Sequence, residues 1–202
     1  MKKLLLGLVA LCLVPLAFAK DFKEGENYEV IKMAGPTAQP EVTEYFSFLC
    51  PHCYAFEPFV QELKAQLPKN VKFDRNHVDF LGRDLGVDLS RSYAVMELLG
   101  VEDKVGPKMF SFIHEQHLKL TGMDDIRKVF VAAGVPGEEF DSAVNSFSVS
   151  GRLAQMERNT QSSDIKGVPT LIVNGKYKVK TGSVSSKEEL FQLVDYLTQL
   201  KD

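Results

Sequence analysis

The sequence has no tryptophan and only three cysteines among its 202 residues, and neither acidic nor basic side chains dominate it. Three cysteines are too few for a scaffold held together by disulfides. The formal net charge of −3 and the lack of a basic stripe argue against nucleic acid as the main partner. With 45% hydrophobic and 25% charged residues, the composition is globular and excludes disordered and fibrous classes. The length suits one domain, or one domain that carries an insertion.

The first 19 residues have the pattern of a secretory signal peptide. Two lysines precede an apolar segment, and residues 17–19 form an A-x-A cleavage site. The apolar run is shorter than the ~20 residues that a membrane-spanning helix needs. We expect cleavage after Ala19. The mature chain then keeps only Cys50 and Cys53, in a compartment where disulfides persist.

The next recognisable pattern is a strand, a helix and a second strand. Residues 42–48 are rich in β-branched and aromatic side chains, which is typical of a strand. Pro51 suits the first position of a helix, and apolar residues then recur at helical spacing over residues 51–67. Pro58 lies inside this helix and is expected to kink it. Residues 71–80 form the second strand, so a right-handed parallel crossover is predicted.

No convincing strand pattern follows between residues 81 and 164. Five helical patterns occur there in succession, which indicates a helical domain inserted between α/β elements. They cover residues 90–99, 103–117, 124–133, 136–147 and 149–162.

Strand signals return near the end of the chain. Residues 170–173 and 176–179 flank Asn174-Gly175, which predicts a hairpin with a type I′ turn. Residues 186–189 form a capping box, and a final amphipathic helix reaches Leu200.

The chemistry of the chain is concentrated in Cys50-Pro51-His52-Cys53, where the first strand gives way to a helix. A C-x-x-C motif in a βαβ unit is typical of thioredoxin-like redox proteins. Unpaired N–H groups and the positive end of the helix dipole favour the thiolate form of Cys50. Cys53 lies deeper in the helix and would resolve a mixed disulfide. His52 adds positive charge near the thiolate, and Pro51 presets the helical turn.

Three other uses of the motif are disfavoured. Zinc needs four ligands, and there is no second cysteine pair; His114 and His117 are expected on a solvated helix face. Covalent haem requires C-x-x-C-H, but Tyr54 occupies the last position. A purely structural bridge across two residues would constrain little chain entropy.

Residues 46–54 (Phe-Ser-Phe-Leu-Cys-Pro-His-Cys-Tyr) resemble the active site of the DsbA family of periplasmic thiol:disulfide oxidases. Residues 77–80, 100–105 and 167–169 also look like that family, so the resemblance covers essentially the whole mature chain. It implies an α/β fold, a thioredoxin fold with an inserted all-helical domain. Residues 20–80 and 157–202 would form the thioredoxin-like domain, and residues 81–156 the insertion.

The resemblance also implies roles for single residues. Cys50 would be the exposed nucleophile, Cys53 the resolving cysteine, and His52 the group that stabilises the Cys50 thiolate. Val168-Pro169 would be a cis-proline loop whose backbone pairs with an extended substrate. From the sequence alone, that bond would be expected to be trans.

Three charged residues complete the set. Glu44 would be buried beneath the disulfide and relay a proton to Cys53, although an outward-facing position is equally compatible with the strand pattern. Arg75 stands where the family often has lysine, and it keeps a positive charge but cannot shuttle a proton. Glu57 would tune the site or simply be a solvated helix residue. Thr170, after the proline, leaves substrate preference open.

The predicted function is donation of the Cys50–Cys53 disulfide to unfolded exported proteins in the periplasm. The resemblance implies reoxidation by a DsbB-like inner-membrane protein. We expect no cofactor, no metal and a monomeric chain. Two alternatives remain open: a reductase or isomerase of the same fold, and a peptide-binding module with an inert disulfide.

Overall fold

A five-stranded mixed sheet, in the order β1-β5-β4-β2-β3, lies at the centre of the fold in the computed structural model, which describes residues 21–31 and 36–200. The strands are β1 (Tyr28–Val30), β2 (Glu41–Phe46), β3 (Lys72–His77), β4 (Thr170–Val173) and β5 (Tyr177–Val179). The expected signal peptide, residues 1–19, lies outside the described residues.

The predicted strand-helix-strand unit is confirmed. Strands β2 and β3 run parallel, and α1 (Pro51–Gln66) connects them. The helix starts at Pro51, as expected, and continues through Pro58. The second strand is shorter than predicted and ends at His77; the Val78 N–H still donates to the Phe46 carbonyl at 2.8 Å, and residues 79 and 80 lie beyond the strand. The parallel register sets Glu44 beside Arg75, which brings two charged side chains together within the sheet.

The C-terminal hairpin also forms as predicted. Asn174 and Gly175 have φ angles of 54° and 64°, as a type I′ turn requires. The Lys176 N–H closes the turn on the Val173 carbonyl at 3.1 Å. The last helix, α7 (Lys187–Gln199), begins at a cap in which the Ser186 side chain accepts a hydrogen bond from the Glu189 N–H.

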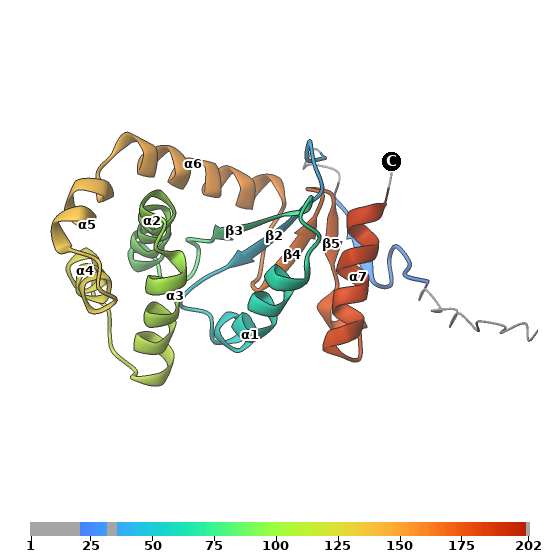
Figure 1. Ribbon diagram of the computed structural model, residues 1–202, viewed down its shortest axis with the longest axis horizontal. Coiled ribbons are helices and arrows are strands. Elements are labelled where there is room, and N and C mark those ends of the chain that lie inside the picture. Colours follow the sequence, from blue (N-terminus) through green and yellow to red (C-terminus); the bar gives the residue numbers. More distant parts are fainter. Residues whose placement is uncertain (1–20, 32–35, 201–202) are drawn as a thin grey trace, which may run out of the picture.

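The two faces of the sheet are covered by different helices (Figure 1). Helices α1 and α7 lie on one face, and α6 (Phe147–Ser162) runs along the other. The core between α1, α7 and the sheet is built from alternate strand residues and helix stripes: Val42, Leu171, Val173, Phe59, Val60, Leu63, Leu190, Leu193, Val194 and Leu197. Glu44 is two residues after Val42 and therefore takes a position that an apolar residue would normally fill.

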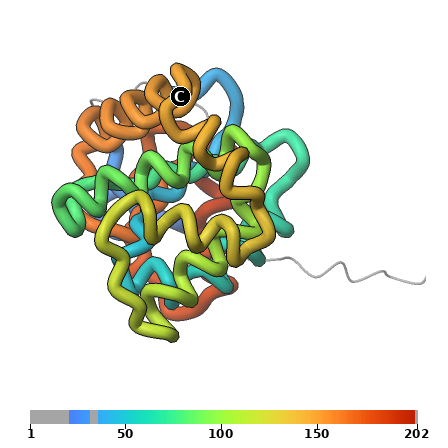
Figure 2. The backbone as a smooth tube through the Cα atoms, turned by 90° about the vertical axis from the view of Figure 1, so that its left-hand side faces the viewer, coloured from blue at the N-terminus to red at the C-terminus, as the bar shows by residue number. Residues whose placement is uncertain are grey.

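The predicted helical insertion is present at one end of the sheet and stands in front in Figure 2. It consists of α2 (Asp84–Leu99), α3 (Glu102–Phe110), a π-helical turn (Ser111–Glu115), α4 (Met123–Ala132) and α5 (Gly137–Val144). Helix α2 starts at Asp84, before the predicted residue 90. The prediction missed its first turns because the buried face includes glycine and serine, which a search for hydrophobic spacing does not detect. The expected boundary between residues 156 and 157 falls within the continuous helix α6, and it stays a prediction.

The core of the insertion extends to the redox motif. A single buried cluster contains Phe46, Phe48, Cys50 and Cys53 together with residues of α2 to α6. The C-x-x-C motif therefore lies where the sheet meets the helical insertion. Among residues 21–31 and 36–200, no helix is both long and apolar enough to cross a membrane.

Candidate active site

Cys50 occupies the N-cap of helix α1. The chain leaves β2 at Phe46, and the Cys50 N–H donates to the Ser47 carbonyl at 3.1 Å. Cys50 itself is extended, with φ −88° and ψ 115°, and Pro51 follows as the first helical residue. A side-chain oxygen commonly accepts from the first helical N–H groups at this position. Cys50 lies at this position, as the sequence predicted, but its side chain makes no capping hydrogen bond to the helix N–H groups.

The two cysteines are free thiols in different surroundings. Cys53 is fully buried, whereas Cys50 is 6% exposed. Burial raises the pKa of the Cys53 thiol well above its ordinary value, although a backbone hydrogen bond from Ser47 partly opposes the rise. The expectation that Cys50 is exposed was wrong: it is the more accessible of the two cysteines, but neighbouring segments bury most of the residue.

Part of that cover is the loop before β4. The Val168–Pro169 peptide bond is cis, as the resemblance implied and the sequence alone did not. The Cys50 thiol donates to the Val168 carbonyl at 3.3 Å. Thr170 turns its hydroxyl back to the Gly167 carbonyl at 2.8 Å, which ties the two ends of the loop together.

Glu44, Arg75 and Glu57 form a chain of ion pairs beneath the motif. Glu44 is fully buried, so the outward-facing alternative was wrong. The Arg75 Nε donates to Glu44 Oε2 at 2.7 Å, and its two terminal nitrogens donate to Glu57 at 2.8 and 3.2 Å. Glu57 is therefore paired and not a freely solvated helix residue. The guanidinium also lies 4.0 Å from the centre of the Phe46 ring.

The charge state of Glu44 is finely balanced. Burial raises the pKa of its carboxyl to about 7, and Arg75 limits the rise. Two features explain why one close cation does not keep the pKa low. Arg75 divides its charge between two carboxylates, and Glu44 Oε1 is buried without a hydrogen-bond partner among the described residues. Glu44 can therefore exchange a proton near neutral pH.

The two residues between the cysteines are exposed. Pro51 fixes the first turn of α1, and His52 extends from it. A thiolate-stabilising role for His52 stays a prediction.

Two histidines outside the motif bind the segment before Cys50. The Phe48 N–H donates to His77 Nε2 at 3.0 Å, and the Phe48 carbonyl accepts from His114 Nε2 at 2.8 Å. The sequence analysis assigned His114 to a solvated helix face, and this was wrong, because its ring packs against Tyr54. Helical spacing did not reveal this contact, which joins residues 66 positions apart. Within the described part of the chain, no three His, Cys, Asp or Glu side chains are grouped as a metal site would require.

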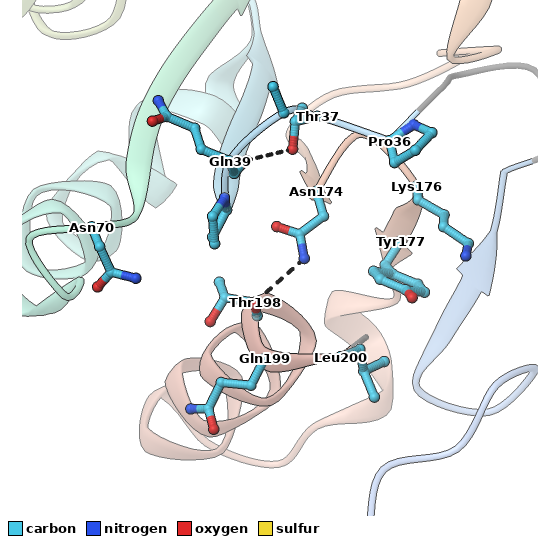
Figure 3. Close-up of a pocket in the computed structure, with 12 residues that line it drawn as sticks. Pro36, Thr37, Gln39, Asn70, Asn174, Lys176, Tyr177, Thr198, Gln199 and Leu200 are labelled. Atoms are coloured by element: carbon cyan, nitrogen blue, oxygen red, sulfur yellow. Dashed lines mark hydrogen bonds between the residues drawn. The ribbon is translucent and has the colours of Figure 1, made fainter. Parts of the chain in front are cut away.

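A cavity of about 550 Å³ lies at the other end of β2, where Figure 3 shows amide and hydroxyl side chains around Asn174. Its position separates it from both cysteines. Asn174 has a structural task there, since its Nδ2 donates to the Leu197 and Thr198 carbonyls and its Oδ1 accepts from the Glu41 N–H.

Comparisons with known proteins agree with the geometry. A family model described as a DSBA-like thioredoxin domain matches residues 41–198. The thiol:disulfide interchange protein DsbA of Escherichia coli K12 is 40% identical over 210 residues, all of this chain and all of that protein. The DsbA of Pectobacterium carotovorum is 44% identical over 92% of this chain and 90% of its own length.

Solved structures of the same family superpose well. One of them is Proteus mirabilis DsbA, solved as a cysteine-to-serine variant with the non-covalently bound peptide PWATCDS. Its sequence is 39% identical to this chain. That match has a TM-score of 0.79 and covers 89% of this chain and 98% of the other. A Klebsiella pneumoniae DsbA has 29% identity, a TM-score of 0.81 and coverage of 90% and 100%. The chain therefore belongs to the DSBA-like thioredoxin family and is a protein thiol:disulfide oxidoreductase with a thioredoxin fold and a helical insertion.

Proposed function

We propose that this oxidoreductase works as an oxidase, which donates the Cys50–Cys53 disulfide to newly exported proteins in the periplasm. The asymmetry of the two sulfurs carries the proposal. Cys50 lies at the N-cap of α1, where helix N–H groups and the dipole favour a thiolate. Cys53 is fully buried, and its raised pKa favours the protonated thiol. A stable Cys50 thiolate stabilises the reduced protein and makes the disulfide a stronger oxidant.

The reaction follows from this asymmetry. A substrate thiolate attacks the Cys50 sulfur, the Cys50–Cys53 bond breaks, and the electron pair goes to Cys53, which takes up a proton. A second substrate thiolate then attacks the substrate sulfur of the mixed disulfide, and Cys50 leaves as the stabilised thiolate. The substrate is oxidised by two electrons and the protein is reduced by two. The two sulfurs carry both electrons, so the exchange requires no cofactor and no metal.

Glu44 is the proposed relay for the Cys53 proton. Its charge contributes to the raised pKa of Cys53, so the two groups interact, and its own pKa of about 7 suits proton transfer in either direction. Arg75 and Glu57 hold the carboxyl in place without carrying the proton themselves. A cavity of about 310 Å³ lined by Glu57 and Arg75 gives that end of the chain of ion pairs access to solvent.

Val168 and Pro169 are proposed to receive the substrate. The Val168 carbonyl contacts the Cys50 sulfur, so a peptide that pairs with this loop would bring its own sulfur to Cys50. Main-chain pairing of this kind depends little on the side chains of the substrate, so one site could bind many different unfolded proteins. The peptide bound to the Proteus mirabilis relative supports peptide recognition in the family.

The surrounding biology is inferred from the family resemblance and the N-terminal sequence. Export by the signal peptide would deliver a monomeric protein to the periplasm. A DsbB-like inner-membrane protein would reoxidise it, with Cys53 resolving the mixed disulfide formed at that stage. No role in nucleic-acid binding is proposed.

The test compares the wild-type protein with Cys50→Ser and Cys53→Ser during oxidation of a reduced, unfolded protein. The oxidised wild type should form substrate disulfides in stoichiometric amounts. Cys50→Ser should form none, and reduced Cys53→Ser mixed with an oxidised peptide should accumulate a mixed disulfide at Cys50.

Other outcomes would favour the alternatives. A reductase would leave the substrate thiols free and consume substrate disulfides instead. An inert binding module would keep its affinity for unfolded chains in Cys50→Ser, while the wild type would transfer no disulfide.

A further inference from the structure

The backbone two residues before Cys50 is held between two imidazole rings. The Phe48 N–H donates to Nε2 of His77, at the end of β3, and the Phe48 carbonyl accepts from Nε2 of His114. His114 belongs to the π-helical turn Ser111–Glu115. The two peptide groups that flank Phe48 are thereby fixed by residues from two separate parts of the fold.

The hydrogen bonds assign opposite proton positions to the two rings. His77 Nε2 accepts, so its proton is on Nδ1, which donates to the Ser90 hydroxyl at 2.7 Å. Burial, with help from Arg75, lowers the pKa of His77 to about 3, which keeps this ring neutral. A carbonyl oxygen can only accept, so Nε2 of His114 must carry a proton.

His114 also contacts the residue that follows the motif. Its ring stacks on Tyr54, with centroids 5.2 Å apart and planes 8° from parallel. The Tyr54 hydroxyl donates to Glu115, which also accepts from the Ser111 hydroxyl at 2.5 Å. His114 thus has one contact before Cys50 and one after Cys53.

The π-helical turn presents two successive residues, His114 and Glu115, to Tyr54. The Gln116 N–H bonds to the Ser111 carbonyl, five residues back, instead of four. The wider turn brings successive residues of this segment against α1: His114 packs against Tyr54, and Glu115 binds its hydroxyl. Single π-helical turns within helices frequently occur at functional sites.

We infer that His114 is a positioning residue for Cys50. Its hydrogen bond fixes the peptide after Phe48, and only Leu49 separates Phe48 from Cys50. Without that bond, the N-cap segment could move, and the Cys50 sulfur would lose its fixed place between the end of α1 and the Val168 carbonyl. This inference rests on the proposed role of Cys50 as the reacting sulfur.

Two substitutions separate the hydrogen bond from the ring contact. His114→Gln keeps an N–H donor near the position of Nε2 but removes the ring. His114→Phe keeps a ring against Tyr54 but has no donor. His117→Asn is the matched control, because His117 is exposed on the same segment, has φ 52°, and makes no side-chain hydrogen bond among the described residues. Asparagine tolerates that conformation.

The measurement is the second-order rate at which reduced glutathione opens the Cys50–Cys53 disulfide, followed by alkylation and mass. The loss of one hydrogen bond predicts a rate about fivefold lower in His114→Phe. His114→Gln should stay within about twofold of the wild type, and His117→Asn should be unchanged. Urea unfolding verifies that each variant is folded. If His114→Phe does not fold, His114→Met, which also lacks a donor, takes its place.

The inference is overturned if the folded donor-free variant reacts at the wild-type rate. It is also overturned if His114→Gln is as slow as His114→Phe, since the ring contact would then be what matters. The exchange rate is measured independently of the reduction potential. A strongly reducing potential with a slow His114→Phe would contradict the proposed oxidase direction and leave the role of His114 standing.

Discussion

Replacing Glu44 by glutamine should change how the stability of the reduced protein depends on pH. The unfolded carboxyl titrates near 4.5, and the folded one near 7, because burial outweighs the attraction of Arg75. Below the unfolded pKa, the group is protonated in both states and does not affect stability. Between about 4.5 and 7 the unfolded carboxyl ionises while the folded one stays protonated, so stability falls across this window; above about 7 both are ionised and the loss is complete.

The size of the effect follows from the shift. At about 1.4 kcal/mol per pKa unit, a rise from 4.5 to about 7 corresponds to about 3 kcal/mol. Glu44→Gln keeps the shape of the side chain and abolishes the titration. Its free energy of unfolding should therefore gain about 3 kcal/mol on the wild type between pH 4 and pH 9.

The assay is urea unfolding of both proteins under reducing conditions at several pH values. The difference between the two curves cancels, to a first approximation, the titration of the cysteines. Glu26→Gln, at an exposed position, removes the same charge without burial and should follow the wild type at every pH. Parallel stability curves for Glu44→Gln and the wild type would refute the reasoning, because they would mean that the buried carboxyl does not titrate in this range.

Three further substitutions test other parts of the account. Arg75→Met removes the cation that limits the rise, so the folded carboxyl should titrate above 7; the loss of stability should still begin near 4.5 but continue to higher pH and become larger, and a window that still ends near 7 in the same unfolding series would contradict the ion-pair argument. His77→Gln should lose less stability than the wild type as the pH falls from about 6.5 towards 3, because the wild-type ring is buried neutral in the folded state and protonates on unfolding; identical acid unfolding of the two proteins would count against it. Leu193→Ala should lower the free energy of unfolding by about 3 kcal/mol in thermal or urea unfolding, because the side chain is fully buried between α7 and the sheet. Phe147→Ser, at a 92% exposed position, should lower it by less than about 0.5 kcal/mol. Similar losses at both positions would contradict the assignment of the core.

Local chemistry made most of the fold predictable. The type I′ turn at Asn174-Gly175 and the cap at Ser186 depend on neighbouring residues, and both formed as expected. Strand β1 was missed because three residues at a sheet edge carry too little pattern. The π-helical turn was predicted as part of a regular helix, since hydrophobic spacing does not distinguish one extra residue in a turn.

In the active site too, the features that depend on neighbouring residues were predictable, and those that depend on tertiary contacts were not. The position of Cys50 at a helix start followed from the strand before it and the proline after it. The burial of Glu44 could not be decided from its strand, because it depends on Arg75 and Glu57, which arrive from β3 and α1. His114 was misassigned for a similar reason, since its partners lie in a segment that only the tertiary fold brings close.

The reduction potential of the mature protein, measured in a glutathione buffer, tests the central claim most directly. Alkylation and mass should report the thiols, because the chain has no tryptophan whose fluorescence could follow the change. A thiolate stabilised at the N-cap of α1 predicts a potential less negative than about −180 mV. A potential near or below about −230 mV would contradict it, and would mean that this chain reduces disulfides more readily than it makes them.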